Sequence, residues 1–182
     1  RVAYNALPTQ ATDDYTARQY YQQVNQIECT RNTNRAFSTP HDDTDIVFGL
    51  LTGYPCCTTN MHQAWPKFTQ NLWYATDDNG LAALVFAPCS VNATVADGVK
   101  VEIKEETFYP FDETVRMTVN FPDKKVKSAY FPLKFRVPGW CEAPAVTVNG
   151  EPVEMSMAAG TVVSLRRNWN KGDVVSIEFP MK

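Results

Sequence analysis

From residue 81 onward, short runs of alternating or β-branched residues recur between Pro, Gly and Asn turns. In VKVEIKEET (99–107), Val99, Val101 and Ile103 are predicted to face a core, and the charged residues between them water. The runs of this kind are 81–87, 99–107, 114–121, 128–137, 145–149, 151–155, 161–167 and 173–179. Many short strands at this spacing predict a mainly β fold, an antiparallel β-sandwich of the jelly-roll kind. Asn149-Gly150 is typical of a tight hairpin turn between two of these strands.

Residues 60–75 predict one amphipathic helix, which the turn residues 77–80 (DDNG) end. Its apolar side chains recur at helical spacing: Met61, Trp65, Phe68 and Leu72. Asn60, or a threonine just before it, is expected to cap the helix. Pro66 is expected to remove a hydrogen bond and bend the axis.

The rest of the N-terminal part lacks a clear period. It predicts a helix end at 1–7, turns at 8–17, a strand at 19–29 and a polar loop at 30–45. Two regions follow from these patterns. Residues 1–80 are irregular with one helix, and residues 81–182 form the β-sandwich domain.

Composition and charge narrow the class of protein. The 182 residues are 44% hydrophobic and 20% charged, which suits one globular domain or a domain with a piece of another. The net charge of −3 and the lack of a basic stripe predict no nucleic-acid partner, and no apolar run is long enough to predict a membrane span. The lysines around Lys124 are expected in a solvated loop. Because the chain opens at Arg1 without Met, a fragment or processed product is expected.

Five cysteines, an odd number, leave at least one free thiol. Cys56 and Cys57 are adjacent, and a disulfide between neighbours closes a strained ring. Metal binding or thiol chemistry therefore explains the pair better than a structural bridge. Just before a helix, a thiolate is stabilised by the first N–H groups and can bind zinc or attack carbon.

A zinc site needs more than two ligands, so others must join the pair. The local candidates are Glu28, Cys29, His41 and His62, and each also has an ordinary interpretation as a packed or solvated residue. The four tryptophans could stack on sugars, but core or interface packing is favoured for each: Trp65, Trp73, Trp140 and Trp169.

The segment CCTTNMHQAWPKFTQNLWYATDDNGLAALVFAPC (56–89) resembles the one that follows the paired cysteines in glycoside hydrolase family 127 and its relatives, the non-reducing-end β-L-arabinofuranosidase-like proteins. Downstream, PLKFRVPGW (132–140), VTVNG (146–150) and WNKGDVV (169–175) resemble patterns of that family's β-sandwich. The resemblance covers roughly residues 47–182, and the order of the motifs makes it specific.

The resemblance implies an (α/α)6 barrel followed by β-sandwich domains, so residues 1–80 are expected to be the end of that barrel. It implies a zinc ion held by three cysteines and a glutamate, and a retaining mechanism with a cysteine nucleophile and a glutamate general acid/base. Carried onto this chain, Cys56 is the nucleophile and a zinc ligand, and Cys57 is a second ligand. The substrate implied is a β-L-arabinofuranoside or a related plant or bacterial glycan.

Two departures from the family pattern change this expectation. The remaining ligands and the acid/base glutamate lie upstream of the paired cysteines in the family, and Glu28-Cys29 has the wrong spacing to replace them. Thr58 and Thr59 also stand where many arabinofuranosidases of the family have prolines. The chain is therefore expected to be inactive alone, with its sugar specificity open.

A second hypothesis is a non-catalytic carbohydrate-binding or structural β-sandwich with vestigial cysteines. A thiol redox protein fits poorly, because the pair is Cys-Cys and not Cys-x-x-Cys. Carbohydrate is the expected partner, and a homodimer through the exposed barrel remnant is a further expectation. For the compartment, a bacterial periplasmic or secreted protein is favoured and a cytoplasmic one stays open.

Overall fold

The computed structural model describes residues 7–14, 16–17 and 60–181. By its internal contacts the chain divides into two compact units, Arg1–Thr69 and Gln70–Lys182. The strand expected at 19–29 and the loop expected at 30–45 lie outside the described residues. Each unit is described by itself.

The helical part is shorter than its pattern predicted. A short helix α1 (Leu7–Thr9) precedes a 3-10 turn η2 (Met61–Gln63) and helix α3 (Ala64–Gln70). Asn60 takes the capping position of η2 without a side-chain cap; its Oδ1 instead accepts a hydrogen bond from Gln63 Nε2 at 2.7 Å. Pro66 falls in the first turn of α3, where its missing N–H has no partner within the helix to lose.

The described part of the second unit holds ten strands. The first five are β1 (Trp73–Ala75), β2 (Leu81–Ala83), β3 (Cys89–Val95), β4 (Val99–Thr107) and β5 (Thr114–Asn120). The others are β6 (Ser128–Arg136), β7 (Ala145–Val148), β8 (Glu151–Pro152), β9 (Val162–Asn170) and β10 (Val174–Glu178).

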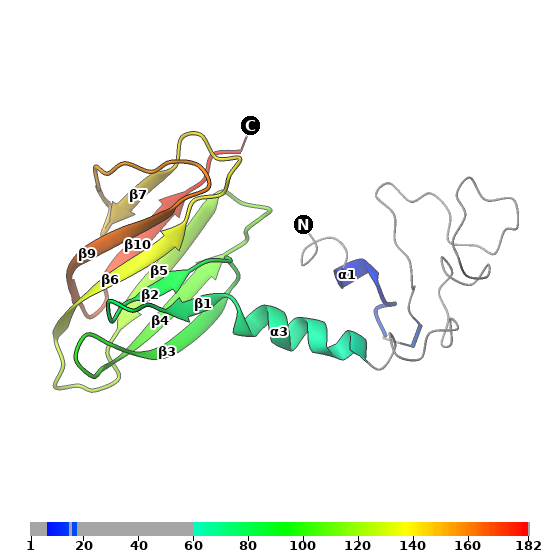
Figure 1. Ribbon diagram of the computed structural model, residues 1–182, viewed down its shortest axis with the longest axis horizontal. Helices are drawn as coiled ribbons and strands as arrows, with labels where there is room; N and C mark the ends of the chain where they lie inside the picture. The colour runs from blue at the N-terminus through cyan, green and yellow to red at the C-terminus, as the bar shows by residue number, and fades with distance from the viewer. Residues whose placement is uncertain (1–6, 15, 18–59, 182) are drawn as a thin grey trace, which may run out of the picture. The chain divides into compact units, whose positions relative to one another are not determined.

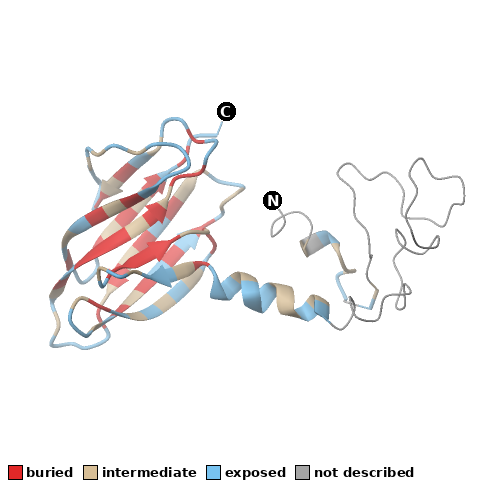
Figure 2. Cartoon of the chain, viewed as in Figure 1, coloured by how far each residue is buried: buried red, intermediate tan, exposed pale blue. Residues whose placement is uncertain are grey.

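These strands form two sheets, with orders β1-β2-β6-β9 and β3-β4-β5-β10-β7-β8 (Figure 1). The faces that meet carry alternate apolar residues, which form one buried cluster between the layers (Figure 2). Its large members with exposed fractions under 2% include Ile103, Phe131, Phe135, Trp169 and Phe179. The β-sandwich is therefore confirmed. It is held mainly by burial of apolar surface, at about 25 cal/mol per Å².

The alternation in β4 is confirmed, because Val101 and Ile103 are buried and Lys104 is exposed. Three other features differ from the sequence-based expectation. β1 lies within the segment predicted as helix, β3 was not predicted at all, and β2 pairs with β6 in parallel. All the other ladders are antiparallel within the described residues.

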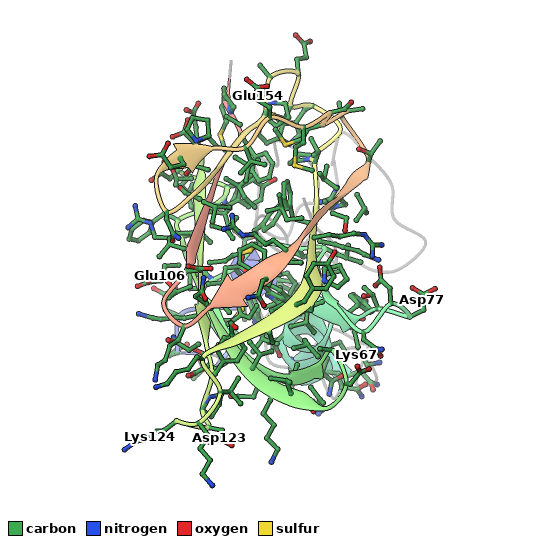
Figure 3. All side chains as sticks on the ribbon, turned by 90° about the vertical axis from the view of Figure 1, so that its left-hand side faces the viewer. Lys67, Asp77, Glu106, Asp123, Lys124 and Glu154 are labelled. Atoms are coloured by element: carbon green, nitrogen blue, oxygen red, sulfur yellow. The ribbon has the colours of Figure 1, made fainter. Side chains whose placement is uncertain are left out.

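Many charged side chains lie on the outside of the sandwich. Figure 3 shows Glu106, Asp123, Lys124 and Glu154 pointing away from the strands. The lysine cluster near Lys124 lies in an exposed connection between β5 and β6, as expected. No helix within the described ranges is long and apolar enough to cross a membrane.

Candidate functional site

The expected nucleophile and zinc ligands, Cys56 and Cys57, lie outside the described residues, as do Glu28, Cys29 and His41. Of the other candidates, His62 is exposed in η2. Within the described residues, the helix expected next to the paired cysteines consists of a three-residue 3-10 turn followed by the seven residues of α3, and it ends at Gln70 instead of residue 75.

The most perturbed carboxyl group of the described residues belongs to Glu105, which is 1% exposed and faces the interior from β4. Its Oε2 accepts a hydrogen bond from Trp73 Nε1 at 2.7 Å, and its Oε1 accepts one from the Ala87 N–H at 3.1 Å. The Cys89 thiol, on the paired residue of β3, donates to Oε2 at 3.8 Å. The carboxylate thus joins β1, β3, β4 and the segment after β2.

Burial raises the pKa of Glu105 to about 7, and the hydrogen bonds from Trp73, Ala87 and Cys89 oppose that rise. Burial, and next the neighbouring Glu105 charge, raises the pKa of Cys89 to about 11. The Cys89 thiol therefore stays protonated at neutral pH and is a poor nucleophile. Burial likewise raises the pKa of Cys141, which is completely buried.

The part of the chain that the structure describes contains no group of three or more Cys, His, Asp or Glu side chains placed to hold a metal. Cys89 and Glu105 are only two such groups, and a thiol with a raised pKa resists the deprotonation that zinc binding needs. These residues do not fit zinc. A zinc site in this protein has to draw its ligands from outside the described residues.

The motif DNGL (78–81) forms a turn between β1 and β2. The Thr76 hydroxyl donates to Asp78 at 2.5 Å, and Lys134 Nζ and Arg166 Nη2 lie 2.9 and 2.6 Å from the Asp78 carboxylate. These contacts, the Thr76 hydrogen bond first, lower the pKa of Asp78 to about 2. A Cβ on Gly80 would lie 2.2 Å from the carbonyl oxygen of Pro132, so only glycine fits there.

The downstream motifs also have structural roles. Asn149 (φ +53°) and Gly150 (φ +85°) form the turn between β7 and β8, where the left-handed backbone favours Asn and Gly. Asn149 also donates to Asp173 at 2.9 Å. Trp169 is fully buried and donates to the Phe131 carbonyl. These residues hold the sandwich together and do not form a catalytic cluster.

The tryptophans divide by environment. The prediction of core packing is confirmed for Trp169. Trp73 is half-buried against the core, and its indole N–H donates a hydrogen bond to Glu105. Core packing is wrong for Trp65 and Trp140, which are 39% and 47% exposed. The interface role expected as the other possibility for these two stays a prediction.

Two exposed apolar residues that the sequence reasoning missed flank Tyr109 and Pro110 in the chain. Phe108 and Phe111, in the connection between β4 and β5, are 79% and 84% exposed. The available signal was FYPF (108–111), an apolar run in a connection where polar residues are usual. Tyr109, Pro110, Trp140 and Met181 line an open depression of about 390 Å³ at this place.

Comparison with known proteins gives the relatives of this chain. Residues 80–181 match the family described as beta-L-arabinofuranosidase, GH127 middle domain. Among solved structures, the chain is similar to Ara127N-Se, a GH127 β-L-arabinofuranosidase from Geobacillus stearothermophilus T6, with 32% identity over 70% of this chain and a TM-score of 0.62. No curated protein matches significantly.

Two further structures match 99% of the chain. One is a glycoside hydrolase, at 25% identity and a TM-score of 0.76. The other, a GH127 β-arabinofuranosidase at 22% identity and a TM-score of 0.69, shows likeness of fold alone. The chain spans 19%, 28% and 27% of the lengths of the three proteins, in the order given.

Proposed function

The chain belongs to the GH127 β-L-arabinofuranosidase family, and from this membership we propose that it is part of a zinc-dependent retaining glycoside hydrolase acting on β-L-arabinofuranosides or related glycans. The observation that carries the proposal is the match of residues 80–181 to the family's middle domain, shortly after the paired cysteines. The two cysteines that the structure describes support the choice of Cys56 and Cys57 as the reactive pair. Cys89 and Cys141 both have raised pKa values and therefore make poor nucleophiles.

In the proposed reaction the Cys56 thiolate attacks the anomeric carbon of the sugar. A carbon–sulfur bond forms as the glycosidic carbon–oxygen bond breaks, and the electron pair leaves with the aglycone oxygen. A glutamate outside this chain gives that oxygen its proton and then takes a proton from water. Water breaks the carbon–sulfur bond from the other side and restores the thiolate. Two inversions leave the anomeric configuration unchanged.

Zinc, when bound, would keep a coordinated thiol deprotonated at neutral pH. Cys56 and Cys57 would supply two of its ligands, and the resemblance puts the others upstream. Because an (α/α)6 barrel would form most of the sugar pocket, we propose that the 182-residue chain alone does not hydrolyse glycosides.

The test compares the chain with an upstream-extended form of the protein, by elemental analysis, thiol titration and hydrolysis of a β-L-arabinofuranoside. We expect one zinc per extended protein, lost in Cys56→Ser and in Cys57→Ser. Cys89→Ser is the matched control, because its thiol contacts only Glu105 among the described metal-ligand types and should leave the zinc content unchanged. An extended protein without zinc, unaffected by either substitution, would favour a non-catalytic sandwich with vestigial cysteines.

A further inference from the structure

The outer face of the four-stranded sheet gathers positive charge. β6 and β9 pair along their whole lengths (Figure 1), and together they carry four cations and no acidic residue. The fourth of these cations, Arg167, lies over the Trp169 ring at 5.3 Å. The other three alternate with core residues and so lie on the outer face: Lys134, Arg136 and Arg166. Only the pairing of two distant strands brings these cations together.

Two exposed tyrosines flank the three cations. Tyr74 is 43% exposed on β1 and lies in one cross-strand row with Lys134, because Ala82 pairs with both of them. Tyr130 is 60% exposed and lies four residues before Lys134 on β6, which is about 13 Å at the rise of a strand. We name the surface of these five residues the basic face: Tyr74, Tyr130, Lys134, Arg136 and Arg166.

The carboxylates around the basic face leave it a net positive charge. Asp78, in the turn between β1 and β2, lies 2.9 Å from Lys134 Nζ and 2.6 Å from Arg166 Nη2. Arg136 donates through Nε to the Leu84 carbonyl at 2.9 Å, and no carboxylate of the described residues pairs with it. Cations also exceed acids among the exposed charges of the adjoining connections: Asp77, Asp123, Lys124, Lys125, Lys127 and Lys171.

The outer face of the six-stranded sheet has a different composition. Charges of both signs alternate along β4 there, and Lys104 pairs with Glu106 at 2.8 Å. None of the large exposed apolar side chains in the described part of the chain lies on a strand of that sheet. Arginines and exposed aromatic rings therefore occur together on one sheet face only, and binding surfaces are enriched in these two residue types.

We propose that the basic face binds a carboxylate-bearing oligosaccharide of the uronic-acid kind. A guanidinium group matches a carboxylate with two parallel N–H donors, and Arg166 is 53% exposed. The C–H face of a sugar ring packs on an aromatic ring, and its hydroxyls need polar partners such as Asn168, which is exposed opposite Tyr130. A second copy of the same face is disfavoured, because like charges would meet. The choice of a sugar over another polyanion rests on the proposed function; the charge of the site does not.

The experiment titrates the 182-residue chain with trigalacturonate and with its methyl ester, which keeps the rings and hydroxyls and removes the charge. Binding is followed by the NMR signals of the Arg136 Nε–H and the Tyr130 ring. We expect trigalacturonate to bind, with an affinity that falls as salt is added, and the methyl ester to bind at least about tenfold more weakly.

Substitutions locate the site. Arg136→Gln and Tyr130→Ala should each weaken the binding of trigalacturonate about fivefold, the upper end for one exposed ion pair. Circular dichroism checks that both variants fold, and the exposed Tyr130 tests the site even if Arg136→Gln unfolds. The matched controls are Lys100→Gln, an exposed cation of β4 in the other sheet, and Phe108→Ala, an exposed ring outside the strands. Neither control should change the affinity.

The site is refuted if trigalacturonate does not bind, or if neither Arg136→Gln nor Tyr130→Ala weakens binding more than the controls do. Equal binding of the methyl ester overturns the assigned ligand class. Binding of oligothymidylate or of an oligoaspartate peptide at least as tightly as trigalacturonate also overturns it, because a nucleic acid or an acidic protein segment would then explain the surface better. The assay needs neither zinc nor hydrolysis, so Cys56→Ser should bind trigalacturonate as the unmodified chain does. An extended protein without zinc or activity would count against the proposed function and leave this binding result standing.

Discussion

The buried carboxyl group of Glu105 should make the stability of the sandwich depend on pH near neutrality. Its pKa is raised by burial from the ordinary 4.5 to about 7 in the folded protein. The folded state therefore binds more protons than the unfolded state between these two pH values, and the free energy of unfolding falls as the pH rises through them. This is the reverse of a partly exposed, ion-paired carboxylate such as Asp78, whose contribution is lost as the pH falls.

The size of the effect follows from the same two values. Each pH unit of difference between the folded and unfolded pKa corresponds to 1.36 kcal/mol, so ionisation of Glu105 costs about 3 kcal/mol between about pH 4 and pH 8. This is a large part of the stability of an ordinary domain, about 5–15 kcal/mol. Glu105→Gln keeps the size of the side chain and removes the charge. It leaves one of the Trp73 and Ala87 N–H groups without its carboxylate oxygen, at a cost of about 1 kcal/mol.

The assay is urea denaturation at several pH values, followed by tryptophan fluorescence, because Trp169 is fully buried. The stability of Glu105→Gln relative to the unmodified chain should rise by about 3 kcal/mol from pH 4 to pH 8. Since both proteins carry the other titrating groups, such as Asp78, these cancel in the difference. Glu106→Gln is the matched control: Glu106 is the next residue of β4, faces solvent and pairs with Lys104 at 2.8 Å, which lowers its pKa. A difference that stays constant with pH, or that Glu106→Gln reproduces, would refute the reasoning.

Three further predictions concern other parts of the chain. Gly80→Ala should lower the free energy of unfolding by about 3 kcal/mol or more in urea denaturation, because the added Cβ meets the Pro132 backbone. The control is Gly139→Ala, where the Cβ has open space and φ is not positive, and it should change the free energy of unfolding by less than about 0.5 kcal/mol. Equal effects of the two substitutions would contradict the steric argument. Asp78→Asn should make the loss of stability between about pH 4 and pH 2 less steep, because the pKa of Asp78 in the folded protein is about 2. Acid titration followed by circular dichroism measures this loss, and an acid transition unchanged by the substitution would contradict the prediction. If the chain forms a homodimer through its barrel remnant, Trp65→Ser should shift the mass measured by light scattering toward that of the monomer, because Trp65 is exposed on α3. A monomeric unmodified chain would contradict the expected homodimer.

Local periodicity predicted most of the sandwich and failed at two strands. β4 follows its alternation from end to end, and the turn at Asn149 and Gly150 is where its two residue types predicted it. The local pattern predicts helix at β1, because Trp65 and Leu72 share a helical period with their neighbours. β1 forms a strand because it pairs with β2 and because Trp73 donates a hydrogen bond to Glu105, which lies 32 residues further along the sequence. Tertiary contacts outweigh a local pattern in such cases.

The alternation of β4 also placed Glu105 on the inner face, since it continues the row of Val101 and Ile103. The sequence could not show that a carboxylate there would be buried with three donors. Those donors come from β1, β3 and the segment after β2, and their approach depends on how the strands pair. The raised pKa of Glu105 is therefore a property of the fold and not of the local sequence.

The sequence by itself determined the β-sandwich and the resemblance to a glycoside hydrolase family, because two-residue alternation and turn residues act between near neighbours. It also directed attention to Cys56 and Cys57, whose roles remain proposals. Only the tertiary structure decided the parallel pairing of β2 with β6, the burial of Glu105 and the exposure of Phe108, Phe111 and Trp140. Sheet order and solvent exposure depend on residues far apart in the chain, and no local pattern of polar and apolar residues specifies them.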